Sequence, residues 1–417
     1  MNEKHAAPDV TGLIHHPYVP PAGFAAPQPG VFKASTVYFP SVAAMRQFEW
    51  KDKSAYTYGL HGTPTTYTLE ERLCALEGGA QCLLVPSGLA ALATVALALL
   101  KTGDEVLMPD NAYGPNKALA EGELRHYGIS HQFYDPMSPQ DMAGKISPRT
   151  RLVWLEAPGS VSMEFPDLPE MVRLCQAQGV LCALDNTWGA GLAFKPFDLL
   201  GDAPASGQRG SLAVDISAHA LTKYPSGGGD VLMGSIITQD PALHLKIKLC
   251  HMRLGLGVAA NDAETVLRSL PSIDLRYKAH DQTARALAAW WQAQPQCAQL
   301  LHPAFDGSPG HAHWQAVCER TPGQGLAAGL FSVMIDPRYS QAQVDAFCDN
   351  LKLFKIGYSW GGPVSLVVPY ELGSMRQGWP AHLKRGTLVR FSTGLESAED
   401  LMHDLIQATQ AHLPWIS

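Results

Sequence analysis

A lysine beside a glycine-rich turn is the first feature of this sequence that could do chemistry. Lys223 lies within residues 215–230, between a run of apolar and small residues and three consecutive glycines. The apolar run 212–216 predicts a short buried strand that ends just before it. A lysine amine that is desolvated, or close to another cation, loses its proton readily and can form a Schiff base. The alternative is a solvated lysine on a glycine-rich turn.

Two other stretches favour the chemical interpretation. Residues 180–189 contain an apolar run that ends in Asp185, and Ser87-Gly88 lies between a strand end and an Ala/Leu-rich helix. Pyridoxal phosphate needs a lysine for its aldehyde and a carboxylate for its pyridine nitrogen. Its phosphate suits the free N–H groups at a helix N-terminus. The order of these three stretches therefore predicts pyridoxal 5'-phosphate as the cofactor. The alternative for Asp185 is a capping carboxylate after a strand.

The elements that must position these residues alternate along the chain. Strands are expected at 81–86, 105–108, 131–134, 151–156 and 181–184, and helices at 68–76, 89–100, 117–127 and 171–178. This alternation predicts an α/β fold with a mostly parallel sheet that helices flank on both faces. Ligands bind such sheets at the carboxyl ends of the strands. Ser87, Asp185 and Lys223 each follow an expected strand.

The length of 417 residues exceeds one ordinary core, so more than one domain is expected. We expect an N-terminal arm (1–65) that contacts a neighbouring subunit, a cofactor-binding α/β domain (66–260) and a smaller α+β C-terminal domain (261–417). In the last part, helices are expected at 279–292, 341–351 and 398–411. Strands with one solvated face are expected at 331–335 and 388–392.

Composition excludes several classes of protein. A net charge of −7 argues against a nucleic-acid or anionic-membrane partner, and no apolar run approaches the length of a membrane span. Residues 1–8 lack the apolar core of a signal peptide. The eight cysteines form no Cys-x-x-Cys pair, and Cys82 and Cys182 lie in apolar strands. We therefore expect reduced thiols, a cytoplasmic location and no metal site.

With these stretches placed, the chain resembles the Cys/Met-metabolism family of pyridoxal-phosphate enzymes from about Tyr56 to the C-terminus. The motifs that carry the resemblance are Tyr-Gly-Leu-His-Gly-Thr (58–63), Leu-Glu-Gly-Gly (76–79), Pro-Ser-Gly-Leu-Ala-Ala (86–91), Asp-Asn-Thr-Trp (185–188), Thr-Lys-Tyr (222–224) and Tyr-Ser-Trp-Gly-Gly (358–362). The resemblance implies a fold-type-I pyridoxal-phosphate transferase fold. It also implies a homotetramer whose active sites are shared between subunits.

The same resemblance assigns roles to single residues. Lys223 would hold the cofactor and move the substrate α proton, Asp185 would pair with the pyridine nitrogen, and Tyr113 would stack on the ring. The phosphate would be bound by Ser87, Gly88, Leu89 and Thr222, with Tyr58 from a neighbouring subunit. The substrate α-carboxylate would be bound by Arg390, with Ser359 and Trp360 lining the same pocket. A core tyrosine and a solvated strand arginine are the alternatives for Tyr113 and Arg390.

Two signals indicate a branch within the family. Residues 156–164, Glu-Ala-Pro-Gly-Ser-Val-Ser-Met-Glu, are similar to the form found in bacterial cystathionine β-lyases, and Trp360 replaces a leucine usual in γ-type members. The implied reaction is β-elimination of L-cystathionine, in sulfur amino-acid (transsulfuration and methionine) metabolism. The alternatives are a γ-type member (cystathionine γ-synthase, O-acylhomoserine sulfhydrylase, methionine or cystathionine γ-lyase) and a regulatory protein that binds the cofactor without turnover.

The chain departs from the family pattern at three places. Leu60 replaces a phosphate-binding arginine, Ala220 replaces a serine, and residues 363–365 lack a usual glutamate. His61, on a segment expected to be extended, would point away from the phosphate. The sequence therefore predicts a phosphate site that depends on main-chain amides, Thr222 and Tyr58, with another arginine or lysine filling the gap as the alternative.

Overall fold

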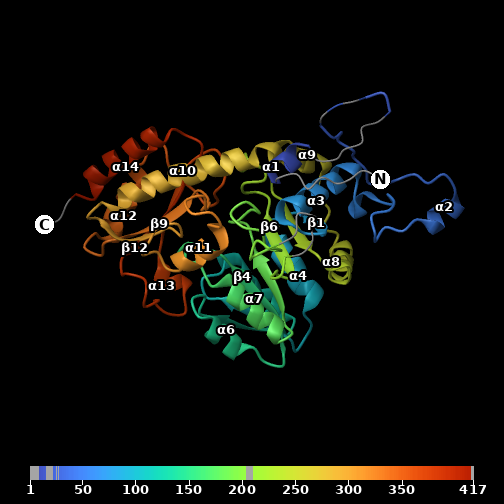
Figure 1. Ribbon diagram of the computed structural model, residues 1–417, viewed down its shortest axis with the longest axis horizontal. Helices are drawn as coiled ribbons and strands as arrows, with labels where there is room; N and C mark the ends of the chain where they lie inside the picture. Colours follow the sequence, from blue (N-terminus) through green and yellow to red (C-terminus); the bar gives the residue numbers. More distant parts are fainter. Residues whose placement is uncertain (1–8, 16–21, 25, 27, 203–209, 415–417) are drawn as a thin grey trace.

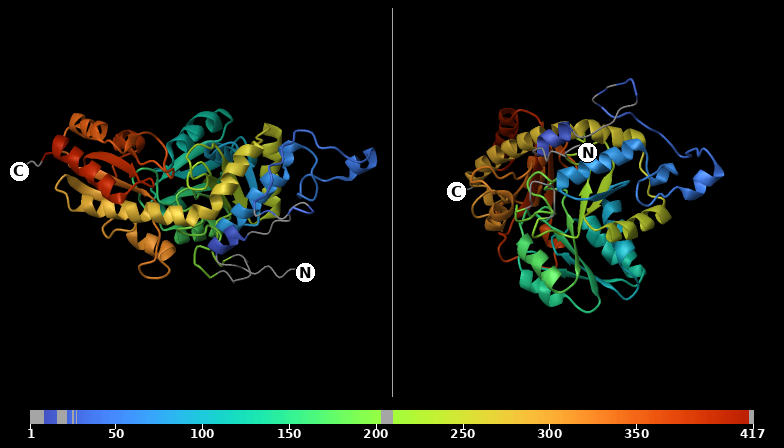
Figure 2. Two further views of the ribbon diagram at one scale, coloured as in Figure 1. Left: turned by 90° about the horizontal axis from the view of Figure 1, so that it is seen from above. Right: turned by 45° about the vertical axis from the view of Figure 1, so that its right-hand side comes forward.

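The computed structural model describes residues 9–15, 22–24, 26, 28–202 and 210–414. The octapeptide considered above for a signal sequence lies outside them. Two sheets organise the chain, one on each side of residue 260, with a long helix, α10 (Ile273–Gln292), running beside both (Figures 1 and 2). The domain limits at 65 and 260 remain our prediction, and the two sheets are compatible with them.

The larger sheet has seven strands in the order β1-β7-β6-β5-β4-β2-β3. All of them run parallel except β7, which is antiparallel to both of its neighbours. The strands are β1 (Gln81–Val85), β2 (Glu105–Pro109), β3 (Ser130–Tyr134), β4 (Thr150–Glu156), β5 (Leu181–Asp185), β6 (Ile216–Ala220) and β7 (Gly234–Thr238). This confirms the predicted α/β fold with a mostly parallel sheet.

Helices cover both faces of this sheet. Successive side chains of each strand point to opposite faces, and the apolar ones on each face pack into a separate hydrophobic core. Cys82, Leu84, Cys182 and Leu184 pack with α3 (Pro64–Glu77) and α7 (Leu168–Ala177). Leu83, Val85 and Ala183 pack with α4 (Gly88–Leu99) and α8 (Pro241–Leu254). The remaining elements of this part are α5 (Gly114–Leu119), the π-helix η2 (Ala120–Leu124), α6 (Pro139–Lys145), α9 (Ala260–Ser269) and η3 (Leu270–Ser272).

One predicted strand was misplaced. The apolar run 212–216 is not a strand; β6 begins at Ile216 and continues to Ala220, three residues before Lys223. The start of β6 is set by its pairing with the neighbouring strands, because Ile216 is aligned with Ala183 of β5 and with Thr238 of β7. Leu212 and Val214 are still buried, but as a connection that packs into the core.

The smaller sheet has the order β10-β11-β12-β9-β8 and is antiparallel apart from the β10–β11 pair. Its strands are β8 (Cys297–Leu301), β9 (Leu330–Ile335), β10 (Lys355–Ile356), β11 (Leu366–Tyr370) and β12 (Thr387–Ser392). Its helices are α10, α11 (His311–Cys318), α12 (Gln341–Asn350), α13 (Leu372–Met375) and α14 (Ala398–His412). The three helices expected in this part are confirmed, and Ser397 caps the N-terminus of α14, its Oγ accepting from Asp400 N.

The expectation of a solvated face on β9 and β12 was wrong. All six residues of β9 are buried, as are the last five of β12. Phe331, Val333 and Phe391 pack into the core beneath α10, α12 and α14. The opposite face lies against the larger sheet's connections, where Ser332 Oγ donates to the carbonyl of Val161 at 2.6 Å.

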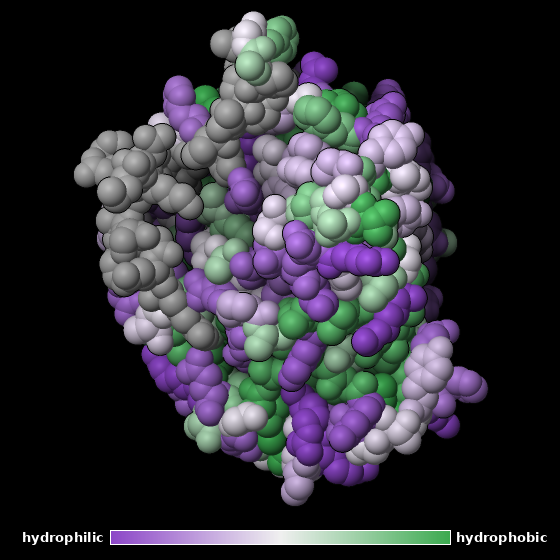
Figure 3. Space-filling view, turned by 90° about the vertical axis from the view of Figure 1, so that its right-hand side faces the viewer, coloured by the Kyte–Doolittle hydropathy of each residue, from purple (hydrophilic) through white to green (hydrophobic). Residues whose placement is uncertain are grey.

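The N-terminal arm lies partly against the larger part of the chain, where Leu13 is buried in the core, and partly extends away from both sheets. It contains α1 (Asp9–Ile14), α2 (Val42–Gln47) and the short 3-10 helix η1 (Gly59–His61). No residue of α2 is buried, and α2 projects from the right-hand end of the molecule (Figure 1). The surface on that side carries apolar areas between polar ones (Figure 3). None of the helices formed by the described residues has the length and apolarity to cross a bilayer.

Candidate active site

Lys223 lies in a turn after β6, where the two sheets meet. Its Nζ donates to Ser359 Oγ at 2.6 Å and lies 5.4 Å from the centroid of the Trp360 ring. Burial, followed by the nearby Arg390 guanidinium, lowers the pKa of Lys223 to about 8, although the Asp185 carboxylate acts in the opposite direction. About a tenth of this amine is therefore neutral and nucleophilic at pH 7, far more than of an ordinary lysine.

Asp185 is the last residue of β5 and belongs to the same edge of the sheet. Its Oδ1 accepts hydrogen bonds from the N–H (3.1 Å) and the hydroxyl of Thr187, whose Oγ1 in turn accepts from Ala220 N at 3.0 Å. Burial raises the pKa of Asp185, whereas the Thr187 hydrogen bonds and the charges of His219 and Lys223 oppose the rise. The carboxyl is thus fixed to the end of β6 and is suited to a cationic ring nitrogen.

Sequence reasoning missed Glu156 as a site residue. It ends β4 directly beside Asp185 in the parallel register, and its carboxylate accepts from Tyr113 N at 2.7 Å and from the Ser160 hydroxyl. Burial, followed by the charge of Asp185, raises the pKa of Glu156. The signal was available in the sequence, because Glu156, like Asp185, ends an apolar strand of a parallel sheet.

Tyr113 follows β2 and forms the N-cap of α5. Its main chain is fixed by Glu156, while the residue as a whole is 42 % exposed. Burial of its hydroxyl, followed by the charges of Asp185 and Glu156, raises the pKa of Tyr113. The phenol is therefore neutral at physiological pH, and its open ring suits a stacking partner.

The N-terminus of α4 forms a cradle for an anion. Ser87 is the N-cap, with its Oγ accepting from Ala90 N at 3.0 Å, and the first-turn amides of a helix lack acceptors within the helix. A Cβ on Gly88 would lie 2.4 Å from the Cβ of Ala220, and one on Gly234 would lie 2.3 Å from the carbonyl oxygen of Ser87. Both glycines are needed for this close approach of helix and sheet.

Thr222 is bonded to Met233, the residue before Gly234, and so lies near this cradle. Its Oγ1 is within hydrogen-bonding distance of both the N–H (3.3 Å) and the carbonyl (3.4 Å) of Met233, so it ties the turn that carries Lys223 to the loop before β7. The long distances leave its hydroxyl able to exchange one of these partners for a phosphate oxygen.

Arg390 enters the site from β12 of the smaller sheet. Its side chain is buried, its Nη2 donates to the carbonyl of Ser359 at 3.3 Å, and its guanidinium lies 5.4 Å from the centroid of the Tyr370 ring. Among the described residues, Nε has no hydrogen-bond partner. Burial lowers the pKa of Arg390, yet the group stays charged. A planar fork with an unused buried donor suits a carboxylate ligand.

Ser359 joins the lysine and the arginine. Its hydroxyl accepts from Lys223 and its carbonyl accepts from Arg390. The residue has φ of 99°, in the region that a non-glycine residue rarely adopts. Such strain persists where surrounding contacts hold it in place, often at functional sites. Trp360 follows, its ring packed 5.5 Å from that of Tyr224.

Tyr58 is the one predicted site residue that the structure places elsewhere. Its hydroxyl accepts from Ser35 Oγ at 3.2 Å on the arm, and its ring lies edge-on to His61. The expectation of an extended segment at His61 was wrong, since residues 59–61 form a 3-10 helix. The His61 ring stacks on Trp50 at 4.4 Å, and Leu60 packs close to Gly257. The role predicted for Tyr58 in a neighbouring subunit stays a prediction.

The comparisons with known proteins agree with this geometry. The model of the family described as "Cys/Met metabolism PLP-dependent enzyme" matches residues 10–410. The chain belongs to this family. Its cofactor is pyridoxal 5'-phosphate, as the sequence predicted.

Several members of the Cys/Met metabolism family resemble the chain over most of its length. It is 35% identical to the cystathionine beta-lyase of Bordetella avium, over 97% of this chain and 98% of that one. It is 32% identical to cystathionine beta-lyase MetC of Escherichia coli, over 89% and 91%, and 33% identical to the L-alanine/L-glutamate racemase of Wolbachia pipientis, over 87% and 84%. The crystal structure of metB from Corynebacterium glutamicum has the same fold, with a TM-score of 0.83, 24% identity and coverage of 97% and 98%.

The residues present fit the cofactor of this family. Lys223 has an amine with a lowered pKa, Asp185 a desolvated carboxyl at the same sheet edge, and α4 an N-terminus whose close packing requires glycine at position 88. These three features supply an imine-forming amine, a partner for a ring nitrogen and an anion cradle.

Proposed function

We propose that the chain catalyses the β-elimination of L-cystathionine to homocysteine, pyruvate and ammonia. The observation that carries the proposal is the meeting of Lys223 and Arg390 on one residue, Ser359, through its hydroxyl (2.6 Å) and its carbonyl (3.3 Å). An amino acid whose α-carboxylate is bound by Arg390 would present its α C–H bond close to the Lys223 amine. The names of the Bordetella and Escherichia relatives support the same reaction.

The residues of the site can carry each step. Neutral Lys223 removes the α proton, while Arg390 holds the carboxylate and so fixes the orientation of the C–H bond. Pyridoxal phosphate supplies the electron sink for the negative charge on the α carbon. The Cβ–S bond then breaks with its electron pair on sulfur, and the proton held by Lys223 can neutralise the departing thiolate. The unsaturated amino acid that remains hydrolyses to pyruvate and ammonia.

Asp185 and Tyr113 would orient the ring, the first through its nitrogen and the second by stacking. The amides of Ser87, Gly88 and Leu89, with Thr222, would bind the phosphate, together with Tyr58 of a neighbouring subunit. The exposed apolar side chains of the arm, among them Tyr38, Val42 and Met45, support an assembly of several copies. We propose a cytoplasmic homotetramer with shared sites.

The test is product analysis with L-cystathionine. We expect pyruvate with homocysteine, and no pyruvate from the Lys223→Ala variant at the same protein concentration. A predominance of 2-oxobutyrate with cysteine would instead make the chain a γ-lyase. Cystine, other cysteine S-conjugates and L-alanine belong in the same panel, the last because one relative is named as a racemase. If the protein turns over none of these substrates, the proposal is overturned.

A further inference from the structure

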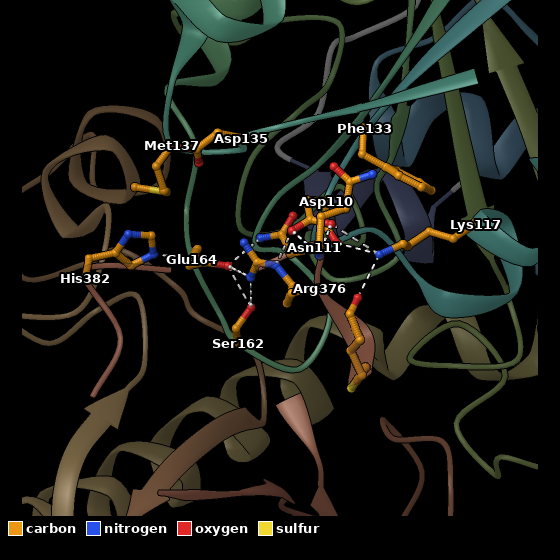
Figure 4. Close-up of polar contacts among 12 residues, drawn as sticks. Asp110, Asn111, Lys117, Phe133, Asp135, Met137, Ser162, Glu164, Arg376 and His382 are labelled. Atoms are coloured by element: carbon orange, nitrogen blue, oxygen red, sulfur yellow. Dashed lines mark hydrogen bonds and ion pairs between the residues drawn. The ribbon is translucent and has the colours of Figure 1, made fainter. Parts of the chain in front are cut away.

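A group of charged and polar side chains lies where the two sheets meet, beside the site. It consists of Asp110, Asn111, Ser162, Glu164, Arg376 and His382, and we call it the Arg376 cluster (Figure 4). Its members come from three segments: the turn after β2, the loop after β4, and the loop after α13 of the smaller sheet. The cluster therefore joins the two parts of the chain.

Arg376 lies between two carboxylates. Its Nε donates to Asp110 Oδ2 at 2.9 Å and its Nη1 to Glu164 Oε2 at 2.8 Å, with only 4% of the arginine side chain exposed. The turn after β2 is held further by Gln377 N, which donates to the Asp110 carboxylate at 3.1 Å. Lys117 adds a cross-link, because its Nζ donates to the carbonyls of Asp110 (2.8 Å) and Met375 (2.7 Å).

Glu164 is fully buried, and the hydrogen bonds to its carboxylate come from members of the cluster. Asn111 Nδ2 and Ser162 Oγ each donate to Oε2 at 2.7 Å, and His382 Nε2 bonds to Oε1. Burial alone would raise the pKa of Glu164, but the His382 hydrogen bond and the Arg376 charge outweigh it and lower this pKa to about 2. The carboxylate is therefore ionised throughout the physiological range.

The cluster holds a strained segment against the turn that carries Tyr113. Val161 has φ of 61° and Met163 φ of 55°, values that are unfavourable for side chains of this kind. Three hydrogen bonds join this segment, residues 156–164, to the turn. At its start, the Glu156 carboxylate accepts from Tyr113 N (2.7 Å), and in its middle Ser160 N donates to the Asn111 carbonyl (2.9 Å). At its end, the Glu164 carboxylate accepts from Asn111 Nδ2. A Cβ on Gly159 would lie 1.9 Å from Asn111 Nδ2, so the two segments are in close contact.

We propose that Arg376 is a positioning residue, which binds Asp110 and Glu164 together and thereby holds the Tyr113 ring in place against the cofactor. Strained backbone persists only where its surroundings over-determine it, and Arg376 is the cation that fixes both segments at once. Glu164 is also the last residue of the β-lyase-like segment noted in the sequence. The inference rests on the role proposed for Tyr113.

The first test compares the holoenzymes of the wild type, Arg376→Met and Arg376→Lys by visible circular dichroism. That signal reports the asymmetric environment of the bound cofactor and requires no substrate. We expect Arg376→Met to lose most of the band and Arg376→Lys, which keeps the charge without the planar fork, to lose part of it. With a substrate that the wild type turns over, kcat should fall on the order of tenfold to a hundredfold while KM changes little.

A matched control separates positioning from stability. Arg285 on α10 bonds through Nε to Asp281 (3.0 Å) and through Nη2 to the Gly325 carbonyl (2.7 Å), away from the site. Arg285→Met should lower the melting temperature without changing the visible band. If Arg376→Met lowers the melting temperature in the same way and leaves the band and kcat at wild-type values, the cluster is structural only and the proposal is overturned. Should Arg376→Met not fold, an unchanged band in Arg376→Lys overturns it equally.

A double-mutant cycle tests the route through Tyr113. If Arg376 acts through that ring, Arg376→Met should cost little further kcat in a Tyr113→Ala background, so that the two effects are not additive. Full additivity would contradict the proposal. Because the dichroism needs only cofactor, a failure of L-cystathionine turnover would overturn the proposed reaction and leave the dichroism test of Arg376 standing.

Discussion

At the scale of single residues, the chemistry depends on the environment of one amine. Burial and the Arg390 cation lower the pKa of Lys223, while Asp185 limits the effect. The same arginine is thus assigned two roles, as the anchor of the substrate carboxylate and as a positive charge that releases the lysine proton. Because the proton on Lys223 blocks attack on an aldehyde, the uptake of cofactor should depend on pH.

The apoprotein should take up pyridoxal phosphate into a borohydride-reducible link at a rate that rises about tenfold per pH unit below a midpoint of about 8 and then levels off. The rate should rise with pH because the neutral, reactive form of Lys223 accumulates as the pH rises through the pKa of this amine. Arg390→Met should move the midpoint upward, and Lys223→Ala should give no reducible link at any pH. Absorbance after borohydride reduction measures all three. A flat pH profile in the wild type would contradict the assignment.

At the scale of elements, the close contact between α4 and β6 shapes the cradle that we propose for the phosphate. Helix N-terminus and strand end approach so closely that Gly88 faces the Cβ of Ala220. The small Ala220, a departure from the family's usual serine, is therefore part of the packing of the cradle. A cradle made of main-chain amides is sensitive to any displacement of the helix.

Gly88→Ala should push α4 away from β6, because its new Cβ would lie 2.4 Å from that of Ala220. We expect a loss of about 1–3 kcal/mol in stability from overpacking and a faster release of cofactor on dialysis. Gly144→Ala in α6, where no atom lies within 4 Å of the new Cβ, is the control and should be neutral or slightly stabilising. Ala220→Gly added to Gly88→Ala should restore retention. A Gly88→Ala protein that keeps its cofactor like the wild type would refute the cradle.

At the scale of the whole molecule, one chain brings Lys223, Ser359 and Arg390 into contact but places Tyr58 apart from them. That residue lies on the arm, bonded to Ser35, and the arm carries exposed apolar side chains. The chain has Leu60 where the family pattern implies a phosphate-binding arginine, so the contribution proposed for Tyr58 of another subunit would matter more. A site completed across an interface can be tested by mixing subunits.

Tyr58→Phe should release cofactor faster than the wild type, whereas Leu60→Arg should retain it equally or better, because an arginine can bind the phosphate. Co-expression of a Tyr58→Ala chain with a Lys223→Ala chain should recover activity that neither variant has alone. In a shared site, about a quarter of the sites then carry neither change. Separate expression followed by mixing of folded proteins serves as the control. Absence of recovery in co-expressed hybrids would place Tyr58 outside a shared site.

Much of the fold was predictable because hydrophobic periodicity is local. The alternation of short apolar strands with helices predicted the mostly parallel sheet. The positions of Ser87, Asp185 and Lys223 after three strands predicted that they lie at one edge of it. The predictions were wrong where strand limits and burial depend on contacts between segments that are distant in the sequence. The start of β6 depends on its alignment with Ala183 and Thr238, and the burial of β9 and β12 on both faces depends on what packs above them.

The sequence by itself determined the cofactor chemistry, because a lysine, a carboxylate and a helix N-terminus at strand ends have few other uses together. Only the tertiary structure decided how these groups are tuned and held. The pKa of Lys223 depends on a guanidinium 167 positions away in the chain. Glu156 becomes part of the site through its register with Asp185, and Arg376 reaches Asp110 and Glu164 from the other sheet. Electrostatic interactions and strain act through space, and distances in space between distant segments are set by packing and not by local sequence.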